Sequence, residues 1–184
     1  MVDTAALPSF RYHPDPIATG SVRASSETCA CCEGIRGFVY TGPVFAEAEL
    51  DNALCPWCIA DGSAHERFDA EFTDAESVGL GWEPVADAVA DEVAFRTPGF
   101  TGWQQERWAS HCEDAAAYIG QADTADLLGE WSAAIPSLRA DVEIGDEDWE
   151  SLLSSFAKGP TGSPTAYVFR CLHCSELVGY WDSH

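Results

Sequence analysis

The chain has 184 residues, of which 46% are hydrophobic and seven are Trp, so it can bury the core of one domain or of two small ones. Its formal net charge of -22 argues against direct binding of DNA or RNA and would attract a basic protein. The alternative is that the acidity reflects the average composition of proteins in the source organism. No apolar run approaches the roughly 20 residues that span a bilayer, and residues 1–10 lack a secretory signal pattern, so we expect no membrane span and a cytoplasmic location.

The first third of the chain predicts an extended segment, a strand and a short helix. Prolines in residues 10–20 forbid a helix and favour an extended path across the surface of the domain. The sequence PheValTyrThr at residues 38–41 is typical of a strand, and the Gly-Pro pair that follows ends it. A short helical segment is expected to begin at Cys55 and to lead to Phe68.

Helices are predicted for the middle of the chain and strands for its end. One helix opens at Pro84, with Val93 on its buried face, and another covers residues 113–119 before Gly120 caps it. A third, amphipathic helix carries Trp149, Leu152, Leu153 and Phe156 on one face. Two strands, at residues 165–170 and 177–181, enclose the final cysteine pair.

These elements predict an α+β fold in which cysteine knuckles and β-hairpins surround a helical middle section. We expect a single compact domain over residues 1–184. Within it, residues 25–72 form a zinc finger that resembles a treble clef, residues 84–157 form the helical middle, and residues 165–184 form a C-terminal CxxC hairpin like that of a zinc ribbon.

The cysteine spacing predicts a first structural metal site. Cysteines in a reducing compartment are more often metal ligands or redox groups than disulfides. A CxxC turn presents two sulfurs on one side, and two such turns complete a tetrahedral zinc site. The pairs Cys29 with Cys32 and Cys55 with Cys58 give knuckle, hairpin and helix N-terminus in that order. This order is the layout of a treble-clef zinc finger.

The remaining thiols allow a second zinc site, which would bring the total to two ions. The set consists of Cys31, Cys112, Cys171 and Cys174, and it reuses no residue of the first site. Adjacent side chains diverge, so Cys31 could face away from the first metal while Cys32 faces it. The alternative for Cys31 and Cys112 is a buried, inert thiol. His111 is a substitute ligand, and His173 is expected to point outward from its knuckle.

Catalytic interpretations find less support in the chain. CysProTrpCys before a helix is similar to the redox dithiol of glutaredoxins, but residues 46–53 do not supply the buried strand that a thioredoxin-like fold places before it. The chain has no HExxH and no GxSxG motif, and a zinc ion held by four cysteines has no open position for water. We therefore expect a protein that is not an enzyme, with redox chemistry as an alternative.

Several motifs in order resemble the CbrC family of bacterial proteins. They include ThrCysAlaCysCys at residues 28–32, LeuCysProTrpCysIle at 54–59, TrpAlaSerHisCys at 108–112 and PheArgCysLeuHisCys at 169–174. The resemblance spans residues 10–182 and implies a role in tolerance of a nuclease-type colicin, in a family for which no enzymatic activity is established. Family members carry a further cysteine near Ala116, so the departure here leaves His111 or Cys31 to complete the second site.

Two surfaces are candidates for binding a partner. An acidic stretch is expected to meet a basic nuclease toxin or a component of the envelope-stress response; its members are Asp141, Glu143, Asp146, Glu147 and Asp148. The segment TrpGlnGlnGluArgTrp at residues 103–108 could bind a ligand, although its tryptophans are more simply explained as core residues. The alternative function is that of an effector which changes the cell surface indirectly.

Overall fold

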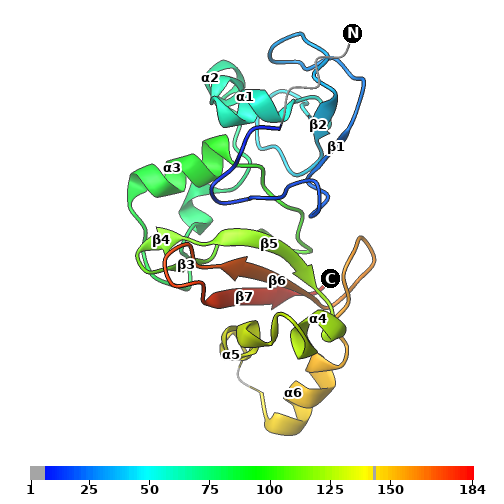
Figure 1. The fold of residues 1–184 in the computed structure, drawn as a ribbon, viewed down its shortest axis with the longest axis vertical. Coiled ribbons are helices and arrows are strands. Elements are labelled where there is room, and N and C mark those ends of the chain that lie inside the picture. Colours follow the sequence, from blue (N-terminus) through cyan, green and yellow to red (C-terminus); the bar gives the residue numbers. More distant parts are fainter. Residues whose placement is uncertain (1–6, 143) are drawn as a thin grey trace.

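The computed structural model describes residues 7–142 and 144–184, and its elements lie in layers along a long axis (Figure 1). At one end lies the N-terminal unit, which holds β1, β2, α1 and α2. The three-stranded sheet β5-β6-β7 lies in the middle, and α4, α5 and α6 lie beyond it at the other end. The mixture of helices with small antiparallel sheets confirms the α+β class.

Short elements make up the N-terminal unit. Strand β1 (Val22–Ala24) pairs antiparallel with β2 (Phe38–Tyr40), which confirms the strand predicted there. The helix predicted after Cys55 is divided into α1 (Pro56–Ala60) and α2 (Ser63–Phe68). The division lies at Gly62, whose φ of 83° is a left-handed conformation that glycine adopts without steric cost.

The surface path predicted for residues 10–20 is wrong for the start of this segment, whereas most of residues 14–20 are exposed as expected. Phe10, Tyr12 and His13 are buried, and Phe10 packs in the core of the N-terminal unit. The Tyr12 hydroxyl donates to Asp114, and the two ring nitrogens of His13 lie 2.6 Å from the Pro98 carbonyl oxygen and from Thr19 Oγ1. The prolines do exclude a helix, but residues 16–20 form a hydrogen-bonded turn and not an extended path. The buried side chains join the N-terminal unit to the rest of the chain.

A connecting segment leads from the N-terminal unit to the sheet. It contains the short 3-10 turn η1 (Ala75–Ser77) and helix α3 (Asp87–Arg96). The predicted helix thus begins three residues after Pro84. Val93 is fully buried, as expected, and half-buried Val89 also packs on the aromatic core described below.

The helix predicted for residues 113–119 is wrong, because this segment forms strands. Strand β3 (Ser110–His111) pairs with β4 (Asp114–Ala115), and β5 (Ala117–Ala122) joins β6 of the main sheet. Gly120, expected as a helix cap, instead has a φ of 137° at a register shift in the β5–β6 pairing. Alanines favour a helix locally, but the hydrogen bonds and side-chain packing gained by pairing with β6 outweigh that preference.

The main sheet confirms both predicted C-terminal strands, which are β6 (Thr165–Arg170) and β7 (Leu177–Asp182). Because side chains alternate along a strand, its two faces carry different residues. One face contributes to the aromatic core, which we define as Phe100, Trp108, Tyr118, Tyr167, Phe169 and Tyr180. The other face, with Val168 and Leu177, packs on a helical layer.

Four short elements form that helical layer. They are α4 (Thr124–Leu128), the 3-10 turn η2 (Ser132–Ala134), α5 (Ile135–Ala140) and α6 (Asp146–Leu153). Helix α6 confirms the predicted amphipathic helix, with Trp149 buried and Phe156 packing just after its end. The helical middle predicted for residues 84–157 must therefore be corrected, because strands β3, β4 and β5 interrupt it.

Candidate metal centres

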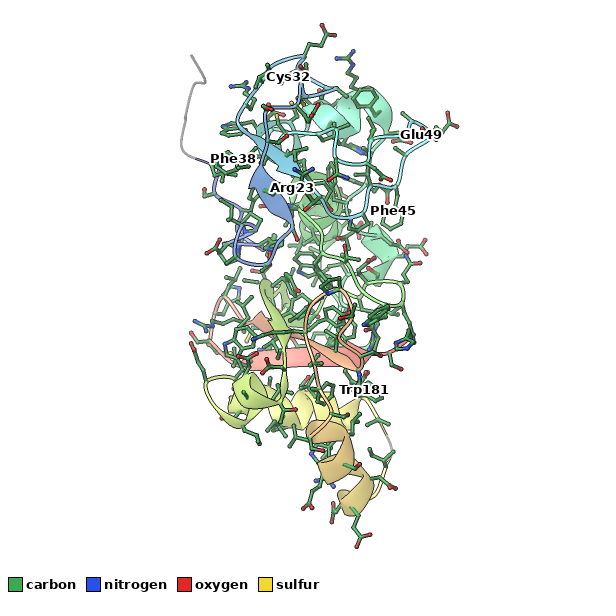
Figure 2. All side chains as sticks on the ribbon, turned by 90° about the vertical axis from the view of Figure 1, so that its right-hand side faces the viewer. Arg23, Cys32, Phe38, Phe45, Glu49 and Trp181 are labelled. Carbon is green, nitrogen blue, oxygen red and sulfur yellow. The ribbon has the colours of Figure 1, made fainter. Side chains whose placement is uncertain are left out.

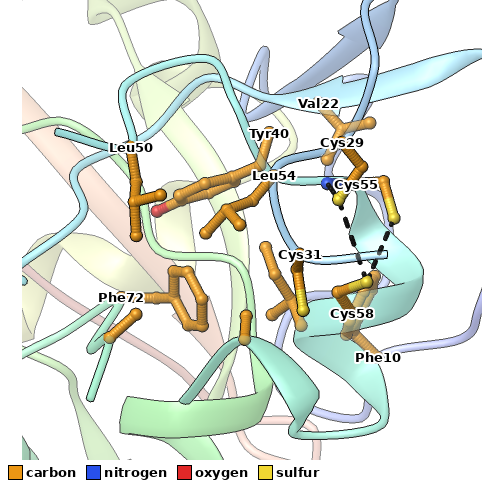
Figure 3. Close-up of a cluster of buried hydrophobic side chains, with 13 residues drawn as sticks. Phe10, Val22, Cys29, Cys31, Tyr40, Leu50, Leu54, Cys55, Cys58 and Phe72 are labelled. Carbon is orange, nitrogen blue, oxygen red and sulfur yellow. Dashed lines mark hydrogen bonds between the residues drawn. The ribbon is translucent and has the colours of Figure 1, made fainter. Parts of the chain in front are cut away.

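Four cysteines converge in the N-terminal unit and form what we call the first centre. Two elements supply them: a tight turn supplies Cys29 and Cys32, and the start of α1 supplies Cys55 and Cys58. Cys55 is the N-cap of α1, and its backbone N–H donates to Cys29 Sγ over 3.3 Å. Figure 3 shows Cys29 and Cys55 directed at Cys58, to which dashed lines join them.

The sulfur separations in the first centre match those of a tetrahedral metal site. The distances are 3.8 Å for Cys29–Cys58, 3.9 Å for Cys32–Cys55 and 3.5 Å for Cys55–Cys58. Ligands about 2.3 Å from a zinc ion in tetrahedral geometry lie about 3.8 Å apart. The hydrogen bond with the Cys55 thiol lowers the pKa of Cys29 and raises that of Cys55, so in the absence of a metal ion the negative charge of this pair lies on the Cys29 sulfur.

The structure does not bring Cys31 to the second set of thiols, which corrects the ligand set predicted from the sequence. Cys31 is buried in the core of the N-terminal unit, and its thiol lies 3.5 Å from Ser63 Oγ. It packs with Cys29, Cys55 and Cys58 in this core and does not reach the main sheet. The third thiol of ThrCysAlaCysCys is therefore a buried packing residue beside the first centre.

The second centre lies at the turn end of the main sheet and combines one histidine with three cysteines. Its members are His111, Cys112, Cys171 and Cys174, so His111 occupies the place expected for Cys31. Cys112 and Glu113 form the two-residue turn between β3 and β4, with φ values of 59° and 61°. Positive φ at both positions is the pattern of a tight type I′ hairpin turn. This rare backbone conformation brings His111 and Cys112, adjacent in sequence, to one site.

The two cysteine knuckles share one hydrogen-bond pattern. In the first, Cys29 N donates to Gly34 O and Glu33 N donates to Cys29 O; in the second, Cys171 N donates to Glu176 O and Ser175 N to Cys171 O. The fourth residue after each first cysteine, Glu33 or Ser175, has a positive φ, of 57° and 65°. The same turn thus presents a cysteine pair in both centres.

The second centre also has metal-like separations. Cys112 and Cys174 sulfurs lie 3.9 Å apart, and His111 Nδ1 lies 3.3 Å and 3.5 Å from them. A tetrahedral zinc site requires about 3.8 Å between sulfurs and about 3.6 Å between nitrogen and sulfur. Burial raises the pKa of Cys171, but the backbone N–H groups of Cys174 and His173 outweigh it and lower that pKa to about 6.

A buried carboxylate next to the second centre holds the surrounding segments together by hydrogen bonds. Asp114, two residues after Cys112, accepts hydrogen bonds from Arg11, Tyr12 and His173, at 2.6, 2.8 and 2.8 Å. Burial opposes its ionisation, yet these partners lower its pKa. His173 points away from the sulfurs, as expected, and instead ties the second knuckle to β4. The contacts with Arg11 and Tyr12 also anchor the N-terminal segment to this centre.

The acidic residues predicted to bind a partner lie partly in ion pairs and partly together in the first turn of α6. Asp141 is held by Arg107 through two hydrogen bonds, and Asp146 is paired with Arg139. Glu147 and Asp148 are exposed in the first turn of α6, and Glu143 lies outside the described residues. In the segment TrpGlnGlnGluArgTrp, Trp108 is fully buried in the aromatic core, whereas the Trp103 side chain is 37% exposed.

His111→Ala is expected to weaken metal binding at the second centre only. Removing a residue that hydrogen-bonds to a metal ligand usually lowers the affinity for the metal roughly 10–100-fold. Removing the ligand itself should lower this affinity at least as much. A competition titration of the metal-loaded protein with a coloured chelator measures this difference. His173→Ala is the control, because its ring contacts Asp114 and not the sulfurs, and a smaller change is expected. Unchanged metal release from the His111 variant would contradict the assignment.

Comparison with known proteins identifies the family of the chain but finds no related solved structure. The model of an uncharacterised protein family, UPF0167, matches residues 7–183. UPF0167 proteins from Mycobacterium bovis (Mb2317) and Mycobacterium tuberculosis (MT2352) are each 47% identical over 184 residues, covering 96% of this chain and 93% of the relative. UPF0167 protein PA1536 of Pseudomonas aeruginosa is 44% identical over 171 residues, which cover 92% of this chain and 93% of the relative. No solved structure matches the chain.

These matches correct the expected family. The prediction of the CbrC family is wrong, because the matching model and these relatives carry the name UPF0167 and not CbrC. Tolerance of a colicin was implied by that resemblance alone, so it stays a prediction without support from the relatives. None of the helices in residues 7–142 and 144–184 is long and apolar enough to cross a membrane.

Proposed function

We propose a function for this chain, which belongs to the UPF0167 family. It is a zinc-binding, non-enzymatic protein that acts by binding a basic protein partner. The two centres would be structural zinc sites, one with four cysteines and one with three cysteines and His111. Soft thiolate ligands in tetrahedral sets suit zinc. Each set already supplies four ligands, which leaves no open position for a catalytic water.

The arrangement around the first centre supports a treble-clef type of zinc finger. A knuckle precedes β2, and the second cysteine pair begins α1, which is the order that defines this finger. Backbone N–H groups at the start of α1 face the sulfurs and stabilise their negative charge. The metal would thus join the knuckle to the helix in a unit that has only short elements of its own.

The distribution of charge carries the proposal of a basic partner. Several of the nine cations are engaged within the molecule: Arg11 with Asp114, Arg107 with Asp141, Arg139 with Asp146, and Lys158 with Asp123 and Asp126. Carboxylates on α6 remain exposed, namely Glu147, Asp148 and Glu150. We call these three residues the α6 acidic face. Such a surface accelerates association with a basic protein and complements its charge.

The experiment measures binding to one defined basic protein, a purified nuclease-type toxin domain, at low and high salt. Exposed charges are screened beyond roughly 10 Å at 0.1 M salt, so the affinity should fall steeply as salt rises. The variant Glu147→Gln, Asp148→Asn, Glu150→Gln should weaken binding about tenfold, because close charge pairs at an interface contribute about 1.5 kcal/mol or more.

A matched control separates local contact from overall charge. Glu47→Gln, Glu49→Gln, Asp51→Asn removes the same charge from exposed residues of the N-terminal unit, where Figure 2 labels Glu49 far from α6. This variant should bind the toxin domain nearly as well as the unchanged protein. Equal losses in the two variants would exclude the α6 acidic face as the contact surface. An affinity that does not change with salt, or the absence of binding at low salt, would contradict the proposal as a whole.

A further inference from the structure

The two centres differ in how far solvent reaches their ligands. In the first centre three of the four cysteines are buried, and Cys32 is exposed. In the second centre Cys171 is the buried ligand, whereas Cys112 and Cys174 are exposed and His111 is partly exposed. Zinc can accept a fifth ligand for a short time, so a competing group can reach an ion at the second centre while the chain stays folded. Access to the first centre requires local unfolding.

An open hollow of about 490 Å³ adjoins the exposed side of the second centre. Its lining residues are all exposed; they are Glu83, Pro84, Cys112 and Glu113. Glu83 is fixed in place, because its carboxylate accepts the Glu113 N–H over 2.9 Å and its backbone carbonyl accepts the Ser110 hydroxyl. Carboxylate oxygens bind zinc, and two negative charges raise the local concentration of a divalent cation. The hollow is therefore suited to lead a zinc ion to Cys112 and away from it.

The segments that meet at the second centre are also joined by contacts that need no metal ion. Asp114 accepts hydrogen bonds from Arg11 and Tyr12 of the N-terminal segment. It is also hydrogen-bonded to His173 of the second knuckle. Strands β6 and β7 pair along all six residues of each strand, up to the turn that holds this knuckle. The main sheet should therefore stay folded when the second centre loses its ion.

We propose that the second centre takes up and releases zinc ions reversibly through this hollow, while the first centre keeps its ion. The protein is then a reversible store of zinc as well as a binding protein. Glu83 and Glu113 attract the incoming ion, and Cys112 offers it a sulfur at the wall of the hollow. The inference rests on the assignment of both centres to zinc in the proposed function, and not on the basic partner.

The test follows the release of zinc from the full-length protein, loaded with two zinc ions, into an excess of the coloured chelator 4-(2-pyridylazo)resorcinol. Two phases of one ion each are expected, with rates about 100-fold or more apart, because release from the first centre requires local unfolding. Hydrogen exchange after the fast phase should find β5, β6 and β7 still protected. Equal rates for the two ions, or loss of this protection with the first ion, would overturn the inference and leave the zinc assignment intact. Fewer than two zinc ions per chain by elemental analysis would overturn both.

A ligand variant assigns the fast phase to one centre. Cys174→Ser removes an exposed ligand of the second centre, so the protein should lose the fast ion and release the remaining ion at the unchanged slow rate. Loss of the slow phase, or retention of both phases, would place the rapidly released ion elsewhere and contradict the proposal.

A pair of charge variants tests the path of the ion. Glu83→Gln, Glu113→Gln removes two charges from the hollow, while the amide oxygen at position 83 can still accept the backbone N–H. Uptake of zinc by the protein that holds one ion should slow about tenfold at low salt, because electrostatic attraction accelerates association roughly 10–1,000-fold. Glu47→Gln, Glu49→Gln removes the same charge from exposed residues of the N-terminal unit and should slow uptake much less. Equal rates of uptake in the two variants would exclude the hollow as the path.

Discussion

Cys55→Ser is expected to release the metal ion of the first centre and to unfold the N-terminal unit. The unit has strands of three residues and helices of five and six residues, all too short to be stable without tertiary support. Structural zinc sites contribute on the order of 10 kcal/mol to the folding of small metal domains, which is comparable with the whole stability of a typical protein. Elemental analysis should find one metal ion fewer per chain, and hydrogen exchange should show residues 20–70 unprotected.

Cys31→Ser is the matched control for this experiment. Its side chain is buried in the same core, but its sulfur is not among the four that converge. The substitution should keep the metal count unchanged and lower the free energy of unfolding by only about 1 kcal/mol, a typical value for a single mutation. If Cys31→Ser lost a metal ion, or if Cys55→Ser retained both, the composition of the first centre would be wrong.

Trp108→Ala should have the largest effect among substitutions away from the cysteines. The Trp108 side chain is fully buried, and its ring centroid lies 5.6 Å from that of Phe100 and 5.7 Å from that of Phe169. Its indole N–H donates to the Ala116 carbonyl over 2.9 Å. Truncation of a buried Trp leaves a cavity and costs about 3–5 kcal/mol, and the orphaned carbonyl adds to this cost. Denaturant unfolding of the metal-loaded protein measures the change.

Trp103→Ala provides the comparison within the same sequence motif. Trp103 is partly exposed, although its indole N–H donates to the Gly162 carbonyl over 2.5 Å. Trp103→Ala removes less buried apolar surface than Trp108→Ala does. The loss in free energy of unfolding should therefore be less than half that of Trp108→Ala. Similar losses in the two variants would mean that the aromatic core tolerates a cavity at Trp108, contrary to the packing described above.

The two candidate metal centres would have different roles in this fold. The first joins elements of the N-terminal unit that are close in sequence, between Cys29 and Cys58. The second joins the β3–β4 turn to the β6–β7 turn, across about 60 residues of chain, and Asp114 ties the N-terminal segment to the same place. Because the sheets are small, metal cross-links at their ends would compensate for a limited number of strand pairings.

Local patterns in the chain were sufficient for the elements whose chemistry is confined to a few residues. The strand at Phe38–Tyr40, the C-terminal hairpin and the amphipathic helix α6 follow directly from residue alternation and spacing. The pairing of Cys29 and Cys32 with Cys55 and Cys58 was also predictable, because a CxxC turn fixes the geometry of its two sulfurs wherever it occurs.

Long-range packing determined the rest. Residues 117–122 form a strand because β6 offers hydrogen bonds and the aromatic core accepts Tyr118, and neither partner is near them in the sequence. His111 rather than Cys31 joins the second centre because a two-residue turn with positive φ aims two adjacent side chains at one site, while Cys31 is held in another core. Spacing along the chain therefore specifies ligands within a turn, whereas the meeting of separate turns depends on the free energy of packing the whole molecule.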